Sequence, residues 1–374
     1  MQPIIKKIEI FTLAIPLHRP FIISLGAIKS AENVIIKIRT STGIVGFGEC
    51  SPFAIIQGET AETAAAVGSY FAKYLIGKNA LDIAKNLAAM DKLMYGNRSI
   101  KSAFDMAFYD IAAQHAGLPL YAFLGDDGDK KIETDYTVSL QDKAAMAADA
   151  QEIQAKGFPV IKVKLGENGP KDVARIQAIR DAVGMQIPLR IDANQGWTLE
   201  EAIETLQALA PFHIQHCEEP IAREQFMDLP LVQSASPIPI MADESCCTAQ
   251  DAKNLIRIKG CNLLNIKLGK SGGIQEALRI VKLAEQHNMP MQVGAFLESR
   301  LAMSAFAHFA CCSQLIRFFD FDTCLMFSHN PVEGGIDYLP NGEIQLPNRP
   351  GIGAHISDDE LAKMKKTCSF EMAV

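Results

Sequence analysis

The sequence predicts an α/β protein in which a (β/α)7β barrel follows a smaller α+β unit. The chain has 374 residues, more than one hydrophobic core usually holds, so we expect two structural units. Strand-like and helical segments alternate regularly from about residue 132, whereas earlier residues show strands first and helices afterwards. We expect boundaries at 1–125 for the α+β unit, 126–324 for the barrel and 325–374 for a segment that returns to the first unit.

The first unit begins with strand patterns and continues with helical ones. Apolar and polar residues alternate over three segments, and a Ser-Thr-Gly turn joins the last two. Helical periodicity follows over three further segments, and Gly117 is a plausible C-cap for the last of them. The predicted strands are 4–15, 32–40 and 43–49, and the predicted helices are 60–77, 80–95 and 98–117.

Eight short apolar segments after residue 132 predict the strands of the barrel. They read ETDYTVSL, VIKVKL, PLRID, HIQHCEE, PIPIMADE, NLLNIKL, PMQVGAF and IRFFDFD. Helices between them open with capping signals, such as Thr198 followed by Glu201 and Thr248 followed by Asp251. Eight strands separated by seven helices are typical of a parallel barrel.

Composition narrows the range of functions. The chain has 36 Lys+Arg against 43 Asp+Glu, and this balance of −7 argues against a nucleic-acid partner. No segment reaches the length of a membrane span, and the first residues lack the apolar core of a signal peptide. Nine cysteines without a CxxC spacing indicate neither a zinc site nor a disulfide framework. We therefore expect a cytoplasmic protein with reduced thiols and no membrane or nucleic-acid partner.

Five charged residues close five successive barrel strands. They are Lys164, Asp192, Glu218, Asp243 and Lys267, at separations of 28, 26, 25 and 24 residues. Each separation corresponds to one βα unit, so the five side chains should surround one mouth of the barrel. Barrel enzymes build their active sites at this C-terminal face.

The three carboxylates of this set predict a metal site. Asp192, Glu218 and Asp243 would repel one another unless a cation lay between them. Hard oxygen ligands without histidine or cysteine suit Mg²⁺. Any one of these acids alone could instead be a strand-end cap or a surface ion pair. Nearby polar residues that could support the ligands are Asn194, Glu219 and Glu244.

The lysines predict acid–base chemistry. Lys162 and Lys164 lie two residues apart on one strand, so both ammonium groups leave on the same face. A neighbouring positive charge lowers the pKa of a lysine, so we expect Lys162 to activate Lys164 as a base and to face the substrate. Lys267 should approach from the opposite side of the mouth. The alternative for Lys162 and Lys164 is a solvated pair at a strand end.

These motifs together resemble a known family. The segments are GFGECSPF at 46–53, KVK at 162–164, DANQGW at 192–197, EEP at 218–220, ADES at 242–245 and NIKLGKSGG at 265–273. As an ordered set they resemble the muconate lactonizing enzyme subgroup of the enolase superfamily. The resemblance implies a capping domain over a modified TIM barrel, with mobile loops near 16–30 and 50–58. It also implies Mg²⁺ on the acidic triad, an enediolate intermediate, acid–base roles for Lys164 on the (S) and Lys267 on the (R) carbon, and assembly into a homo-oligomer.

The sequence FDFD at 319–322 favours one reaction within this subgroup. Asp320 and Asp322 leave the eighth strand on one face, and two carboxylates naturally pair with a cation. In dipeptide epimerases, which this segment resembles, such a pair binds the substrate's α-ammonium, and a threonine corresponding to Thr137 lines the site. The two aspartates could instead form a strand-end ion pair. Alternative reactions are those of N-acylamino acid racemases and o-succinylbenzoate synthases, and a different class is a non-catalytic barrel that binds a dipeptide.

Two further positions favour an uncharged substrate. Epimerases of L-Ala-L-Glu carry an arginine in the first loop, and alignment of the segment 16–28 places Gly26 there. Phe296, after the seventh strand, should bring a bulky ring towards the pocket. The resemblance therefore implies a small dipeptide such as Ala-Ala, with D-Ala-D-Ala from cell-wall turnover as the leading candidate and L-Ala-D/L-Glu as the alternative.

Overall fold

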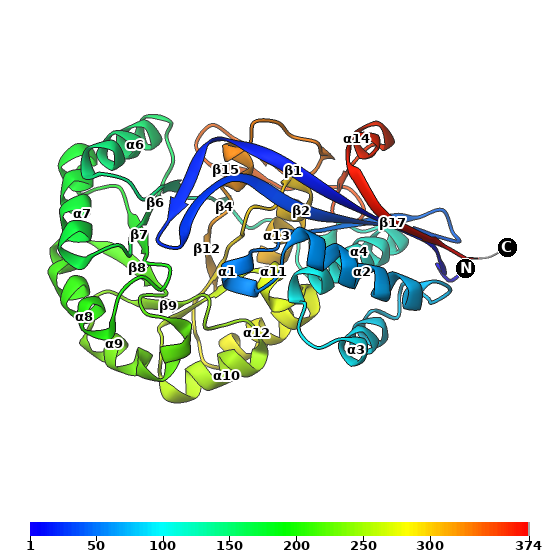
Figure 1. Ribbon diagram of the computed structural model, residues 1–374, viewed down its shortest axis with the longest axis horizontal. Coiled ribbons are helices and arrows are strands. Elements are labelled where there is room, and N and C mark those ends of the chain that lie inside the picture. Colours follow the sequence, from blue (N-terminus) through cyan, green and yellow to red (C-terminus); the bar gives the residue numbers. More distant parts are fainter. Residues whose placement is uncertain (373–374) are drawn as a thin grey trace.

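The eight predicted barrel strands form one parallel sheet, in sequence order from β5 to β12, that curls around a central axis. The computed structural model describes residues 1–372 of the chain. Figure 1 shows the barrel with its ring of helices on one side and the remaining sheet and helices on the other. The barrel strands are β5 Tyr136–Val138, β6 Ile161–Lys164, β7 Leu189–Asp192, β8 Ile214–Glu218, β9 Ile240–Ala242, β10 Leu263–Ile266, β11 Met291–Val293 and β12 Ile316–Phe319.

Polar contacts join the first and last strands of this sheet. The backbone N–H of Asp135 donates to the carbonyl of Phe319 at 3.3 Å. The backbone N–H of Phe321 donates to the hydroxyl of Thr134 at 2.9 Å. These bonds place the start of β5 beside the end of β12, which closes the sheet into a barrel. The prediction of a barrel is confirmed.

Helices cover the outside of the barrel between successive strands. Two of these helices begin with the capping boxes predicted at Thr198 and Thr248. In each box, the side chain of the cap residue and the side chain three positions later accept a hydrogen bond from each other's backbone N–H. Apolar residues of the helices pack on the strands in one continuous core. The helices are α6 Lys143–Ala155, α7 Gly169–Val183, α8 Leu199–Ala208, α9 Leu229–Ala235, α10 Ala249–Ile258, α12 Ile274–Gln286 and α13 Arg300–Ala310, with the short α11 Leu268–Ser271.

The first unit is an antiparallel sheet backed by helices. Its strand order is β17-β1-β2-β3. A second hydrophobic core fills the space between this sheet and the helices. Gly117 adopts the left-handed conformation that ends α4, as expected. The elements are β1 Ile5–Ile23, β2 Gly26–Thr40, β3 Val45–Cys50, β17 Lys365–Glu371, α2 Ala61–Leu75, α3 Ile83–Leu93 and α4 Arg98–Ala116.

Strands β1 and β2 are longer than the sequence pattern predicts. The segment 16–30, expected as a loop, forms the far end of a hairpin in which Ile23 pairs with Gly26. The pairing is irregular between Pro16 and Phe21, because proline has no N–H to donate to a neighbouring strand. Figure 1 shows the hairpin crossing from the capping sheet over the barrel mouth.

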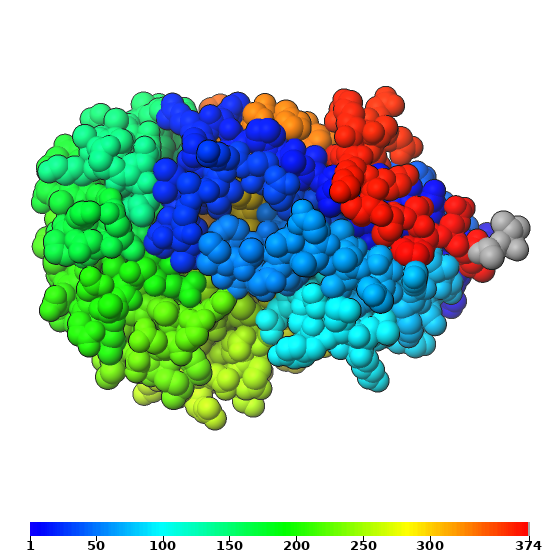
Figure 2. Space-filling model, viewed as in Figure 1, coloured from blue at the N-terminus to red at the C-terminus, as the bar shows by residue number. Residues whose placement is uncertain are grey.

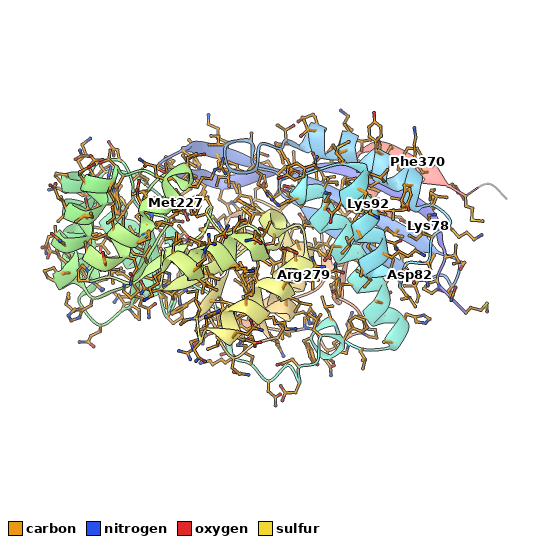
Figure 3. All side chains as sticks on the ribbon, turned by 90° about the horizontal axis from the view of Figure 1, so that it is seen from below. Lys78, Asp82, Lys92, Met227, Arg279 and Phe370 are labelled. Carbon is orange, nitrogen blue, oxygen red and sulfur yellow. The ribbon has the colours of Figure 1, made fainter. Side chains whose placement is uncertain are left out.

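The residues after the barrel return to the first unit. Strand β17 pairs antiparallel with β1, for example Ile8 with Phe370. In a perpendicular view, Phe370 lies in the capping half and Met227 in the barrel half (Figure 3). No helix among the described residues is both long and apolar enough to cross a membrane. The remaining elements are α1 Ala54–Gln57, α5 Leu120–Phe123, α14 Asp358–Lys363, β4 Ile132–Glu133, β13 Glu333–Gly334, β14 Asp337–Tyr338, β15 Glu343–Gln345, β16 Ala354–His355, η1 Ala210–Phe212, η2 Arg223–Asp228 and η3 Thr323–Met326.

Glu49 of β3 fixes the capping sheet to the barrel. Its buried carboxylate accepts hydrogen bonds from the backbone N–H groups of Ser299 (2.9 Å) and Ala302 (3.1 Å), at the start of α13. It also accepts from the Ser299 hydroxyl at 2.7 Å and from the amide of Asn33 at 2.7 Å. A carboxylate at a helix N-terminus is stabilised by the free N–H groups there. This contact holds one wall of the barrel mouth against the cap.

Candidate active site

The three predicted metal ligands converge at the barrel mouth. Asp192 and Glu218 end β7 and β8, and Asp243 directly follows β9. One carboxylate oxygen from each lies within 4.8 Å of the others, and all three side chains are buried. Adjacent parallel strands end at the same edge, which explains why residues so far apart in sequence meet here.

Each of the two predicted bases contacts one member of this triad. The Nζ atom of Lys164 lies 2.6 Å from Oδ2 of Asp192. The Nζ atom of Lys267 lies 2.7 Å from Oδ2 of Asp243. The two lysines therefore contact different members of the triad. Burial opposes the charged form of Lys267, but Asp243 outweighs it and raises the pKa of Lys267 above its ordinary value.

Negative charge exceeds positive charge in the buried mouth. Burial, and then the charge of Asp243, raise the pKa of Glu244 well above its usual range. Burial raises the pKa of Glu219 to about 7. Carboxylates in this state would be stabilised by a further cation, and an all-oxygen donor set is the one that Mg²⁺ prefers. The site therefore fits Mg²⁺. The buried cations are Lys162, Lys164, Arg190, Lys267 and Lys270, and the buried acids are Asp135, Asp192, Glu218, Glu219, Asp243, Glu244, Asp320 and Asp322.

A cavity of about 250 Å³ lies between the two lysines and the capping residues. Lys164 and Lys267 both line it. Space-filling atoms of the hairpin and of α1 surround a hollow on this face of the molecule (Figure 2). The apolar lining consists mainly of Phe21, Ile23, Ile28, Phe53, Phe296 and Leu297. A cavity of this size and lining suits a ligand smaller than most drug-sized molecules, with an apolar side chain.

Asp320 and Asp322 line the same cavity, as does Thr137. The backbone N–H of Thr137 donates to Oδ2 of Asp322 at 2.7 Å. Burial, and then the charge of Asp320, raise the pKa of Asp322 to about 7. The cavity lining therefore combines two buried acids with the two lysines that contact the triad.

The comparisons with known proteins agree with this geometry. Residues 6–125 match the family described as "Mandelate racemase / muconate lactonizing enzyme, N-terminal domain", and residues 145–360 match "Enolase C-terminal domain-like". The chain belongs to the mandelate racemase/muconate lactonizing enzyme family of the enolase superfamily. The family resemblance read from the sequence motifs is confirmed.

Several relatives that are similar over nearly the whole chain are named as epimerases. The chain is 54% identical over 365 residues to the D-Ala-D/L-Ala epimerase of Cytophaga hutchinsonii, with 98% of this chain and 99% of the relative covered. It is 39% identical over 353 residues to the L-Ala-D/L-Glu epimerase of Bacillus subtilis, with 93% and 96% covered. A crystal structure of dipeptide epimerase from C. hutchinsonii, complexed with Mg and D-Ala-L-Val, superposes with a TM-score of 0.97 at 54% identity, covering 98% of this chain and 99% of that one. The prediction of an isomerase is confirmed.

The sequence predicts that Lys162 of this enolase superfamily member faces the substrate, whereas the structure places its side chain among buried carboxylates. Its side chain is only 1% exposed and does not line the cavity. Its Nζ atom contacts Asp320 at 2.8 Å, Glu218 at 3.1 Å and Asp192 at 3.4 Å. Burial lowers its pKa, but these acids outweigh burial and raise the pKa well above the ordinary value. Lys162 is therefore neutralised by carboxylates rather than free to act as an uncompensated positive neighbour of Lys164.

Gly26 lies at the tip of the hairpin in this family member, and not in the cavity wall. A Cβ atom at this position would meet no other atom within 4 Å, but its φ of +135° is rarely adopted by L-residues. The neighbouring Ser24 hydroxyl donates to the carbonyls of Ala193 (3.2 Å) and Asn194 (3.0 Å), which ties the tip to the barrel. A side chain at Gly26 would thus start close to the mouth without an obvious clash.

Three residues that contact the triad were not predicted from the sequence. Lys270 donates to Oδ1 of Asp243 at 2.7 Å, and its position one helical turn after Lys267 is the signal that could have identified it. Gln292 donates to Oε1 of Glu218 at 2.9 Å. Asn265 donates to Oε2 of Glu218 at 3.2 Å. These contacts fix the orientation of the carboxylate oxygens of Glu218 and Asp243.

Proposed function

We propose that this protein is a Mg²⁺-dependent dipeptide epimerase that inverts the α-carbon of the C-terminal residue of a small, uncharged dipeptide. The leading substrate is Ala-Ala, of the D-Ala-D-Ala type. One observation carries the proposal: Lys164 and Lys267 contact different members of the acidic triad and line one cavity, and Asp320 and Asp322 line the same cavity. Two proton carriers and two acids are the groups that such a substrate requires.

The two lysines would move one proton out and one proton in. A neutral amine on one side takes the α-proton, and the protonated amine on the other side gives a proton to the opposite face of the carbon. The atoms balance, because the product has the composition of the substrate and differs only in configuration. The contacts of Lys164 with Asp192 and of Lys267 with Asp243 support this role, because they fix both amines beside the acidic triad.

The acidic triad would hold the metal. Bound to Asp192, Glu218 and Asp243, Mg²⁺ would supply positive charge next to the substrate carboxylate and so make the α-proton more acidic. Gln292 and Asn265 keep the oxygens of Glu218 in place, and Lys270 does so for Asp243.

The ammonium group of the substrate would bind at the two aspartates of the cavity lining. Asp320 and Asp322 would pair with it, beside Thr137. N-acylated amino acids have no such cation, so these two aspartates argue against the N-acylamino acid racemase and o-succinylbenzoate synthase alternatives.

The apolar wall supports an uncharged C-terminal side chain. Phe296, Phe53 and Ile28 lie on this wall, and Lys164 and Lys267 are the only cations among the described residues that line the cavity. The similarity to a relative named D-Ala-D/L-Ala epimerase also supports Ala-Ala. The similarity to an L-Ala-D/L-Glu epimerase keeps an acidic side chain as the alternative, which the Gly26 position disfavours.

Incubation with a dipeptide library in D₂O tests the proposal. Each turnover should place one deuterium at the α-carbon of the C-terminal residue, which mass spectrometry detects, and chiral chromatography should show the inverted epimer. A Lys164→Ala/Lys267→Ala double variant is the matched control and should leave the library unlabelled. Binding of a dipeptide by the unmodified protein without deuterium uptake would instead indicate a non-catalytic dipeptide-binding barrel.

We also propose that the protein is a homo-oligomer in the cytoplasm. The family resemblance supports a homo-oligomer, which analytical ultracentrifugation of the purified protein tests directly. The nine cysteines are all free thiols, a state that suits the reducing cytoplasm. Fractionation of the source cells would test this location.

A further inference from the structure

Residues 53–58, which include the short helix α1, bring part of the capping domain into the cavity wall. Phe53 and Ile56 both line the cavity, and Ile56 is only 7% exposed. The ring centre of Phe53 lies 6.5 Å from that of Phe296, which follows the seventh barrel strand. The position of this segment therefore affects the space that the cavity offers to a substrate side chain.

One polar contact holds this segment to the barrel. The guanidinium group of Arg223, at the start of η2, donates to the backbone carbonyl of Ile56. Carbonyl groups in the last turn of a helix have no partner within the helix, and an arginine side chain can satisfy them. Within residues 1–372, no other hydrogen bond or ion pair joins residues 53–58 to the barrel. The contact with Arg223 is therefore the specific polar link between α1 and the barrel.

Arg223 is itself fixed to the strands that carry the acidic triad. Its backbone N–H donates to the side-chain oxygen of Gln195 at 3.1 Å. Gln195 follows strand β7, and its own N–H donates to the carbonyl of Glu219, which follows β8, at 2.8 Å. The segments after β7 and β8 stay side by side as far as the bridge between Trp197 and Ile221. Because these extensions of the barrel strands are hydrogen-bonded to each other, they give Arg223 a fixed base.

Arg223 lies outside the cavity that contains the two proposed bases. It lines a separate cavity of about 500 Å³, and it is not among the described residues that line the cavity with Lys164 and Lys267. Its other side-chain partner is Glu224, at 3.2 Å, whose side chain is 73% exposed. Ile56 lines both cavities. Arg223 can therefore act on a ligand of the main cavity only through α1.

From these contacts we propose that Arg223 is a positioning residue for the substrate side chain. It holds the carbonyl of Ile56, and through α1 it fixes the distance between Phe53 and Phe296. Loss of this contact leaves α1 without its polar anchor, so the apolar wall becomes less ordered and the limit on side-chain size weakens. The effect on the substrate rests on the proposed dipeptide epimerase function, whereas the effect on α1 can be measured without a substrate.

Hydrogen exchange of the substrate-free protein tests the hold on α1. The backbone N–H groups of Ile56, Gln57 and Gly58 donate within the segment, so their exchange with D₂O reports its opening. Mass spectrometry of peptides covering residues 53–58 should show exchange about tenfold faster in Arg223→Ala, because a hydrogen bond from a charged group is lost. Arg223→Lys should give a smaller increase, since it keeps the charge but loses the planar guanidinium group.

Two variants elsewhere serve as controls. Arg279→Ala removes a barrel arginine that is 61% exposed and pairs with Glu276 at 2.8 Å (Figure 3), and it should leave exchange of residues 53–58 unchanged. Ser24→Ala removes a contact between the hairpin tip and the barrel, so exchange should rise in residues 20–28 but not in 53–58. Unchanged exchange of residues 53–58 in Arg223→Ala would overturn the proposal, as would an equal rise in Ser24→Ala.

Steady-state kinetics provides the second readout. Arg223→Ala should raise KM for Ala-Ala about tenfold and keep kcat within about threefold, because Lys164 and Lys267 keep their contacts with the triad. The ratio of kcat/KM for Ala-Leu to that for Ala-Ala should rise about fivefold, since the larger side chain gains space and buries more apolar surface. A fall in kcat with unchanged KM and an unchanged ratio would overturn the positioning role.

Failure of the fold and failure of the proposed function can be distinguished from failure of this inference. Circular dichroism and thermal melting establish whether Arg223→Ala folds. If it does not, Arg223→Lys and Gln195→Leu, which removes the acceptor of the Arg223 N–H, provide the same comparison. If the unmodified protein turns over no dipeptide, the proposed function fails, and hydrogen exchange still decides whether Arg223 holds α1.

Discussion

Nζ of Lys164 lies 2.6 Å from Oδ2 of Asp192, so a predicted base directly contacts a predicted metal ligand. The carboxylate that pairs with the lysine in this structure is also one of the three that would bind the metal. The groups proposed for metal binding and for acid–base chemistry are thus adjacent.

The first prediction concerns the metal. Asp243→Asn should lower kcat by about a thousandfold or more, because positive charge beside the reacting carboxylate is lost. Circular dichroism should remain unchanged, since the amide keeps the shape of the side chain. Treatment of the unmodified protein with EDTA should abolish deuterium exchange, and added Mg²⁺ should restore it. Asp337→Asn, at a side chain that is 71% exposed, is the control and should have no effect. Full activity in EDTA would contradict the metal assignment.

The second prediction concerns the two bases. Lys267→Ala should still exchange the α-proton of the (S) epimer with solvent through Lys164, but it should not produce the other epimer. Lys164→Ala should behave in the opposite way, with exchange confined to the (R) epimer. Proton NMR in D₂O follows each epimer separately. Equal loss of exchange from both epimers in either variant would show that the lysine also has a binding role.

The third prediction concerns Gly26. Gly26→Arg should raise kcat/KM for L-Ala-L-Glu relative to Ala-Ala by about tenfold or more, because a buried carboxylate gains a partner. The φ of +135° at this position makes any side chain unfavourable by about 1–3 kcal/mol, so Gly26→Ala is needed to measure that effect alone. Steady-state kinetics with both dipeptides gives the ratio. If the unmodified enzyme turned over L-Ala-L-Glu faster than any uncharged dipeptide, a residue other than the one at position 26 would bind the glutamyl side chain of the substrate.

The fourth prediction concerns the size of the side-chain pocket. Phe296 lines the cavity, and its ring centre lies 4.9 Å from Nζ of Lys267. Phe296→Ala should raise kcat/KM for Ala-Leu relative to Ala-Ala by about tenfold, since the larger side chain gains space and buries more apolar surface. Phe296→Leu should give a smaller change in the same direction. An unchanged ratio in Phe296→Ala would mean that the ring does not limit the substrate.

The fifth prediction concerns stability. Glu49→Ala should lower the free energy of unfolding by about 3 kcal/mol or more, because it leaves several buried donors without an acceptor. These donors are the amide of Asn33 and the N–H groups of Ser299 and Ala302. Thermal melting followed by circular dichroism measures the effect, with Glu371→Ala, at a side chain that is 70% exposed, as the control. Equal melting temperatures for the two variants would exclude Glu49 as the main link between cap and barrel.

The barrel and the convergence of its three acids could be predicted because their spacing is a property of the chain alone. Asp192, Glu218 and Asp243 each lie at the carboxyl end of a strand, and parallel strands bring such residues together at one edge. The full length of the β1–β2 hairpin could not be predicted, since Pro16 interrupts the alternation that identifies strands.

The partners of Lys162 could not be predicted either. Its contacts with Glu218 and Asp320 cross the interior of the barrel, and they depend on how the strands close and tilt. A sequence pattern shows that two lysines share a face, but not which acids from distant strands will meet them. The same limit applies to Gln292 and Asn265, whose short contacts with Glu218 come from strands further along the sheet.

The pairing of β1 with β17 has a consequence for biosynthesis. Ile8 and Phe370 are neighbours in the sheet, but the whole barrel lies between them in the chain (Figure 1). As the ribosome extends the polypeptide, β1 can pair with β2 early. The other edge of β1 stays unpaired until the barrel and then β17 have been synthesised. An uncovered strand edge is a site for wrong association, so the nascent chain should depend on chaperones during this interval. Strand β17 would then complete the sheet whose hairpin covers the barrel mouth.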